Sequence, residues 1–90
     1  MVGKGEKGKI LVVDDEPSIL ELLDIMLRRE GYSVQTASTG EAAIKVLAKA
    51  EYDAVITDIA MSGINGIELL SRVRQKHHDT AVIVMTAHGS

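Results

Sequence analysis

Cysteine is absent from this sequence of 90 residues, and aromatic residues are scarce, with two tyrosines and no phenylalanine or tryptophan. Without cysteine the chain forms no disulfide, no thiolate metal site and no cysteine nucleophile. With so few aromatic side chains it lacks a stacking platform for single-stranded nucleic acid, and its net charge of -3 creates no basic field for phosphate backbones. We therefore predict that the chain does not bind nucleic acid directly.

Long apolar runs are also absent, because none approaches the roughly 18 residues that span a bilayer. The N-terminus has no apolar core of a signal peptide either. These two absences predict a protein with no membrane association that works in the cytoplasm. Residues 1–9 alternate glycine with lysine and glutamate, a composition that buries nothing, and we expect a disordered leader or a cloning remnant there.

What the sequence does contain is a regular alternation of two patterns. Short apolar, β-branched runs predict strands at residues 10–13, 32–37, 52–57 and 81–85. Amphipathic stretches between them predict helices at residues 17–30, 38–50 and 66–75. The order β-α-β-α-β-α-β predicts an α/β fold with right-handed crossovers, a parallel sheet and helices on both of its faces.

Local signals mark the ends of these helices. Pro17 suits a first turn, and Gly31 suits the residue that closes the first helix. Ser38 and Glu41 have the spacing of a capping box ahead of the second helix. Helical spacing predicts a core-facing stripe on each of the first and third helices. The first stripe consists of Ile19, Leu22, Leu23 and Met26, widened by Leu20 and Leu27, and the second consists of Ile67, Leu70 and Val73, with Leu69 alongside.

Acidic residues follow two of the predicted strands. Asp14 and Asp15 come directly after the first strand, and Asp58 ends the third. If these strands are neighbours, the three carboxylates meet at one edge of the sheet. Carboxylates at such short separations repel one another, and they stay ionised when a cation neutralises their charge. Mg²⁺ prefers such oxygen ligands, so the pattern predicts a magnesium site.

This arrangement suggests phosphoryl chemistry, but each residue also has a simpler interpretation. An aspartate with a free oxygen can attack phosphorus to give an acyl phosphate, and the hydroxyl of Thr86 at the end of the fourth strand could contact a phosphoryl oxygen. Alternatively, an aspartate after a strand caps a helix or forms a turn. Thr86 could equally be an ordinary residue at a strand end.

Three segments in register resemble the receiver domain of two-component response regulators: ILVVDDE at residues 10–16, DIAM at 58–61 followed by Gly66, and VMTA at 84–87. The resemblance implies a flavodoxin-like, doubly wound parallel sheet with strand order 2-1-3-4 over the part present. It also implies that a sensor histidine kinase donates a phosphoryl group to Asp58.

The resemblance further implies a role for each site residue. Asp15 and Asp58 would bind Mg²⁺ directly, Asp14 would act through water, and Ala60 would contribute its carbonyl oxygen. Thr86 would move toward the phosphoryl group as the switch hydroxyl. The segment from Thr86 is similar to receivers that control AAA+ transcriptional activators, which implies a transcriptional output domain in the parent protein.

The sequence departs from the receiver pattern in two places. Ser62 stands where receivers usually have proline. Residues 10–90 also make only a partial receiver, without the fourth helix, the fifth strand with its lysine, or the fifth helix. We therefore expect impaired phosphorylation, and self-association through the open edge at residues 81–85 or by helix exchange. The alternative is an excised or engineered fragment that assembles and has no phosphotransfer activity.

Overall fold

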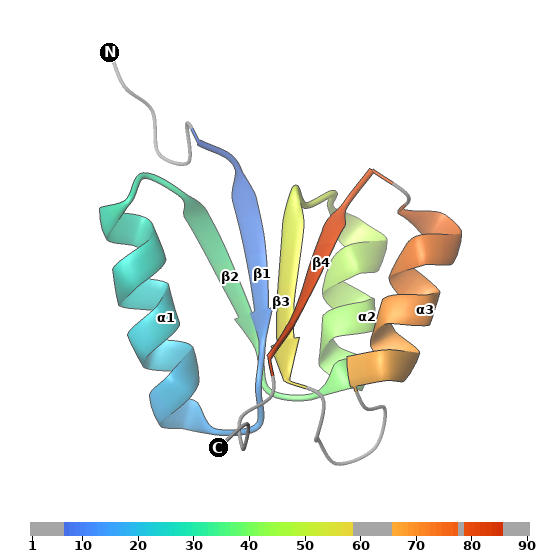
Figure 1. The fold of residues 1–90 in the computed structure, drawn as a ribbon, viewed down its shortest axis with the longest axis horizontal. Helices are drawn as coiled ribbons and strands as arrows, with labels where there is room; N and C mark the ends of the chain where they lie inside the picture. The colour runs from blue at the N-terminus through green and yellow to red at the C-terminus, as the bar shows by residue number, and fades with distance from the viewer. Residues whose placement is uncertain (1–6, 59–65, 78, 86–90) are drawn as a thin grey trace.

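The computed structural model describes residues 7–58, 66–77 and 79–85, which form a parallel sheet flanked by helices (Figure 1). The strands are β1 (Lys9–Val13), β2 (Ser33–Ala37), β3 (Ala54–Asp58) and β4 (Ala81–Met85). The helices are α1 (Pro17–Arg29), α2 (Gly40–Lys49) and α3 (Gly66–Lys76). All pairings are parallel, and the strand order is β2-β1-β3-β4. This order confirms the predicted flavodoxin-like sheet.

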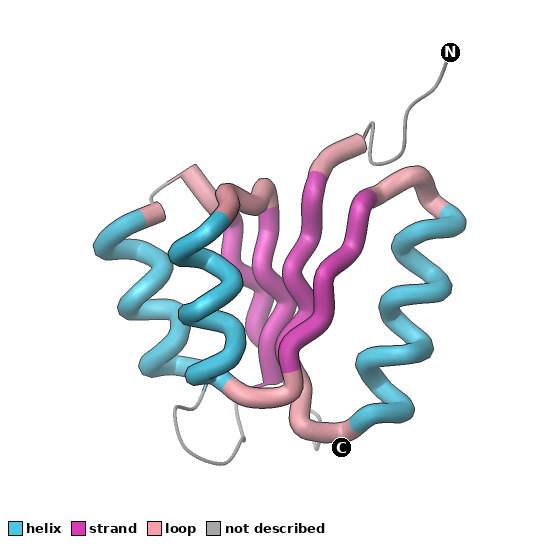
Figure 2. The backbone as a smooth tube through the Cα atoms, turned by 180° about the vertical axis from the view of Figure 1, so that it is seen from behind, coloured by secondary structure: helices cyan, strands magenta, loops and turns pink. Residues whose placement is uncertain are grey.

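Helices cover the two faces of the sheet unequally. Helix α1 lies on one face, and α2 and α3 lie side by side on the other, as both views show (Figures 1 and 2). Side chains alternate between the faces along each strand, so Leu11 and Val13 join the core under α2 and α3 while Ile10 and Val12 join the core under α1. These four side chains are buried because the sheet is covered on both faces at β1.

Backbone hydrogen bonds confirm the predicted end of α1. Gly31 has a φ of 100°, which suits glycine because it has no Cβ. Its N–H donates to the carbonyl oxygen of Arg28 at 3.0 Å, and the N–H of Tyr32 donates to that of Leu27 at 3.1 Å. This pair of bonds is the Schellman motif, and it turns the chain into β2.

The N-cap of α2 lies one residue later than predicted. The Ala42 N–H donates to Oγ1 of Thr39 at 3.0 Å, so Thr39 and not Ser38 caps the helix. Because both residues have a hydroxyl, the sequence did not distinguish them.

The predicted stripes on α1 and α3 were partly wrong. Leu20, Leu23 and Leu27 pack toward the sheet from α1, whereas Leu22 and Met26 are about half exposed, at 53% and 49%. On α3 the buried side chains are Leu69 and Val73, while Ile67 is 54% exposed. Apolar residues occupy so many positions of these helices that their spacing did not fix which side faces the sheet.

The folded part of the chain includes residues that we expected to belong to a disordered leader at residues 1–9. Lys9 lies in β1, and its N–H donates to Oδ2 of Asp53 at 2.8 Å. The carbonyl oxygen of Gly8 accepts from the Ser33 N–H at 2.9 Å, and the N–H of Lys7 donates to the Gly31 carbonyl at 3.3 Å. Backbone hydrogen bonds therefore include residues that the composition assigned to a leader. Residues 1–6 lie outside the described ranges.

Within the described ranges the longest helix is α1, with 13 residues, and none of the helices combines the length and hydropathy that a membrane span requires.

Candidate metal centre

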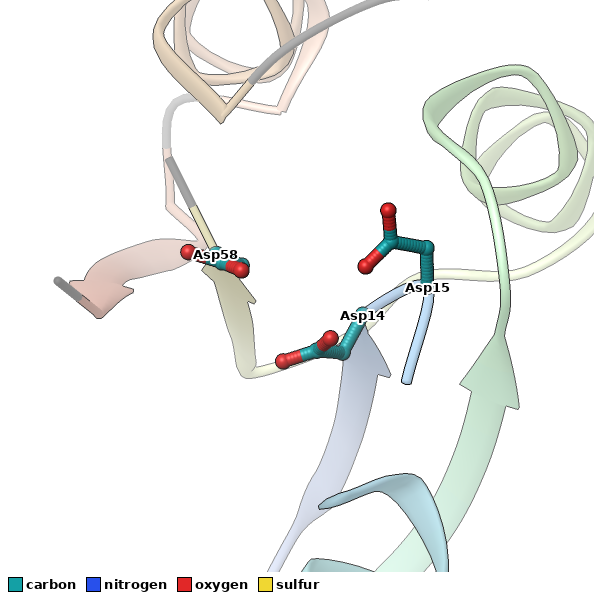
Figure 3. A group of neighbouring side chains, drawn as sticks. All are labelled: Asp14, Asp15 and Asp58. Atoms are coloured by element: carbon teal, nitrogen blue, oxygen red, sulfur yellow. The ribbon is translucent and has the colours of Figure 1, made fainter. Parts of the chain in front are cut away.

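Parallel pairing of β1 and β3 brings the predicted acidic residues together. Val13 pairs with Thr57, so Asp14, which follows β1, and Asp58, the last residue of β3, lie at the same edge of the sheet. Asp15 follows in the loop toward α1. The three carboxylates surround a common space at this edge (Figure 3).

One carboxylate oxygen from each residue lies within 4.8 Å of those from the other two. Asp14 and Asp58 are buried, with exposed fractions of 2% and 5%, whereas Asp15 is exposed. The cluster therefore has a buried side formed by the strand ends and an open side at Asp15. A small ligand can approach from the open side.

Asp14 also has the turn-forming role that the simpler interpretation gave it. Its Oδ1 accepts a hydrogen bond from the Glu16 N–H at 2.9 Å, and its own N–H donates to the Ala37 carbonyl at 3.1 Å. The first bond shapes the turn that leads from β1 toward α1, and the second joins the end of β1 to the end of β2. One carboxylate thus shapes the turn and faces the acidic cluster, and the two interpretations do not exclude each other.

Burial raises the pKa of the Asp14 carboxyl above its usual value. The N–H of Glu16 opposes this rise by donating to the carboxylate. The negative charges of Asp58, Asp15 and Glu16 reinforce it. The ionised cluster is therefore unfavourable by itself, and a cation among the three groups would relieve it.

The donor set fits magnesium. Carboxylate oxygens are the ligands that Mg²⁺ prefers, and two oxygens on opposite sides of the ion lie about 4 Å apart. The carboxylate oxygens of the three aspartates lie within 4.8 Å of one another, which is close to this separation. Small movements of the side chains would therefore allow direct bonds from two aspartates and a water bridge to the third. Two other predicted site residues, Ala60 and Thr86, lie outside the described ranges.

Thr57 is a buried polar residue at this edge that the sequence did not single out. It is completely buried, and its hydroxyl donates to the backbone carbonyl of Asp58 at 3.2 Å. This bond satisfies a polar group beside the site and helps to hold the end of β3. A threonine inside an apolar run is the single signal in the sequence, and β-branched residues are common in strands for other reasons.

Comparison with known proteins assigns the family. Residues 10–90 match the family described as the response regulator receiver domain. The transcriptional regulatory protein GlrR of Escherichia coli is 41% identical over 81 residues, which are 90% of this chain and 18% of GlrR. The chain therefore spans less than a fifth of that relative.

Solved structures agree with this match. The response regulator TrrA of Thermotoga maritima, in complex with Mg²⁺ and BeF, is 48% identical with a TM-score of 0.85, and the match covers 90% of this chain and 70% of TrrA. A complex of the histidine kinase ThkA with TrrA matches at 48% identity and a TM-score of 0.84, covering 91% of this chain and 71% of the matched chain. This chain belongs to the response regulator receiver domain family.

Proposed function

We propose that this chain is a phosphoacceptor module that takes a phosphoryl group from a sensor histidine kinase onto Asp58. The observation that carries this proposal is the convergence of the three aspartates, whose oxygens lie within 4.8 Å of one another at the carboxyl edge of the sheet. Asp58 ends a paired strand and is buried, so its carboxylate is held in place before a phosphoryl donor arrives.

In the proposed reaction, a carboxylate oxygen of Asp58 attacks the phosphorus of a phosphohistidine. The new O–P bond forms as the N–P bond breaks, and the imidazole nitrogen keeps the bonding electron pair. Asp58 then carries an acyl phosphate. Bound Mg²⁺ would offset the negative charge of the carboxylates and of the phosphoryl group.

Each remaining site residue has a proposed role. Asp15 and Asp58 would bind the ion directly, and Asp14 would hold one of its waters while its bond to the Glu16 N–H keeps the turn in place. Ala60 would add a carbonyl oxygen, and Thr86 would contact the phosphoryl group. Family resemblance supports these last two roles.

The comparisons also support proposals about the parent protein. TrrA forms a complex with a histidine kinase, and GlrR is a transcriptional regulatory protein. By analogy, the parent of this chain would pair with a sensor histidine kinase in the cytoplasm and control an output domain for transcription, of the AAA+ activator type. The alternative, an assembling fragment without phosphotransfer, gains no support from these relatives.

Acetyl phosphate tests the proposal without a kinase. The chain would be incubated with acetyl phosphate and either Mg²⁺ or EDTA, and its intact mass measured. We expect a phosphoryl adduct that requires Mg²⁺ and is lost in Asp58→Asn. An adduct that persists in Asp58→Asn would contradict the assignment.

Asp79→Asn is the matched control. Asp79 is an exposed aspartate before β4, at the opposite edge of the sheet from the cluster. Its substitution makes the same chemical change and should leave the adduct intact. If the 90 residues give no adduct while a chain extended through a fifth strand does, the fragment alternative would stand for this chain.

A further inference from the structure

A groove between α2 and α3 lies on the face of the sheet opposite α1, with a volume of about 150 Å³. Its apolar walls come from Ile44, Leu47 and Ala48 of α2 and from Val73 of α3. The two helices run side by side in both views (Figures 1 and 2). Ala48 is exposed, so the groove opens to the surface.

The size of the groove limits what it can hold. A cavity of about 150 Å³ accommodates a molecule such as benzene, whereas pockets for larger organic ligands measure roughly 300–1,000 Å³. The groove therefore suits one large apolar side chain. Such a side chain, inserted from a partner, is the usual anchor of a small protein interface.

Basic residues surround this apolar space. Arg72 and Lys76 line it from α3 and are exposed, and His77, the residue after α3, also lines it. Helices α2 and α3 together contain five of the ten basic residues of the chain, although the net charge of the chain is -3. Their acidic residues are Glu41 and Glu68, and Glu68 pairs with Arg72 at 3.4 Å. The surface around the groove is therefore more basic than the chain as a whole.

Arg72 and Lys76 are four residues apart, so they lie on the same side of α3 about one turn apart. Two acidic residues at the same spacing on a partner helix would match them. We propose that the groove binds an acidic amphipathic helix of another protein, with one large apolar side chain inserted between α2 and α3.

Helix α1 of a second copy fits this description less well. It exposes Leu22, Ile25 and Met26. Its acidic residues Glu21 and Asp24 are balanced by Arg28 and Arg29, and Arg28 pairs with Asp24 within the helix. The groove thus complements a helix of more negative charge than α1. The proposal does not depend on chemistry at Asp58.

NMR titration of the 90-residue chain tests the proposal. The probe is a synthetic helical peptide of about 15 residues with two glutamates four positions apart and a central phenylalanine. We expect chemical-shift changes confined to α2 and α3, and an affinity loss of about tenfold or more when the phenylalanine is replaced by alanine. Absence of shift changes at a peptide concentration of about 1 mM would overturn the proposal.

Charge reversal on α3 provides the matched comparison. The double substitution Arg72→Glu with Lys76→Glu should weaken peptide binding about tenfold or more, and Arg74→Glu, on the same helix but outside the groove lining, should change it much less. Equal effects of the two changes would overturn the proposal. The phenylalanine and alanine peptides are compared on the unaltered chain, so that comparison remains valid even if a substituted chain misfolds.

Two further results would overturn the choice of partner. Octanoate that produces the same shifts, while the peptide produces none, would identify a small anionic amphiphile as the ligand. Shifts in α1, α2 and α3 that depend on protein concentration without peptide would identify a second copy.

Discussion

On the face of the sheet that α2 and α3 cover, Leu69 and Val73 are almost completely buried, whereas every residue of α1, on the other face, is at least partly exposed. The core under α2 and α3 contains eight buried residues, and the core under α1 contains three among the described residues. Both faces have apolar strand residues, so the difference comes from the helices. One helix covers less of a four-stranded sheet than two do.

This difference predicts where stability and open apolar surface lie. The deeper face should provide most of the free energy of unfolding, because hydrophobic stabilisation follows the apolar area removed from water. The shallower face leaves Leu22, Ile25 and Ile83 about half exposed. Contacts with other chains on this face would therefore bury apolar side chains that the fold leaves exposed.

The largest expected effect is on stability. Leu69→Ala, on the deep face, should lower the free energy of unfolding by about 2–5 kcal/mol, because it opens a cavity in a fully buried site. Leu23→Ala, on the partly exposed face, should lower it by about 1 kcal/mol. Urea denaturation measures both. Equal losses would show that α1 contributes as much as α3 and would break the comparison.

A change at the acidic edge sharpens the comparison by acting on neither core. The pKa of Asp14 is higher in the folded chain than the value of 3.8 for the unfolded chain. Without Mg²⁺, the protonated carboxyl therefore contributes fully to stability below pH 3.8, and this contribution is lost as pH rises through the folded pKa. Asp14→Asn should therefore stabilise the metal-free chain at neutral pH, by a gain that shrinks as pH falls toward 3.8.

Denaturation across pH in EDTA measures this gain. It should be similar in the Leu69→Ala and Leu23→Ala backgrounds, since the effects of well-separated sites add. Addition of Mg²⁺ should raise the stability of the parent chain more than that of Asp14→Asn. A stability gain from Asp14→Asn that grows as pH falls would contradict the assigned direction.

The smallest expected effect on stability comes from a change on the shallower face. The same change should have a separate effect on assembly. We propose that the chain self-associates through β4, where Ile83 is 52% exposed. Ile83→Lys should reduce self-association in light scattering with little change in unfolding. The control is Ile67→Lys on α3, where the side chain is similarly exposed, at 54%, on the other side of the sheet. A well-folded monomer at high micromolar concentration would contradict this proposal.

The sequence pattern predicted a parallel sheet, and it predicted the acidic cluster on the condition that the first and third strands are neighbours. Short β-branched runs separated by amphipathic stretches leave a parallel sheet as the simplest fold, and parallel strands bring Asp14, Asp15 and Asp58 to one edge. The family resemblance fixed the strand order before the structure did.

Details that depend on single contacts were not predictable in the same way. Thr39 caps α2 in place of Ser38, since two adjacent hydroxyls offer equal local signals. The apolar residues of α1 and α3 left the rotation of each helix open, which depends on how it packs on the sheet. Gly8 is held by a hydrogen bond to Ser33, a residue distant in the sequence, which the composition of residues 1–9 could not indicate.

The central claim is that the acidic edge makes Asp58 the phosphoacceptor, and chemical mapping tests it most directly. Borohydride reduces an acyl phosphate to an alcohol, so treatment after acetyl phosphate and Mg²⁺ marks the phosphorylated residue for peptide mass spectrometry. The account predicts conversion of Asp58 to homoserine in the peptide that contains it, with no conversion in EDTA. Conversion at Asp14 or Asp15 with Asp58 unchanged would contradict it.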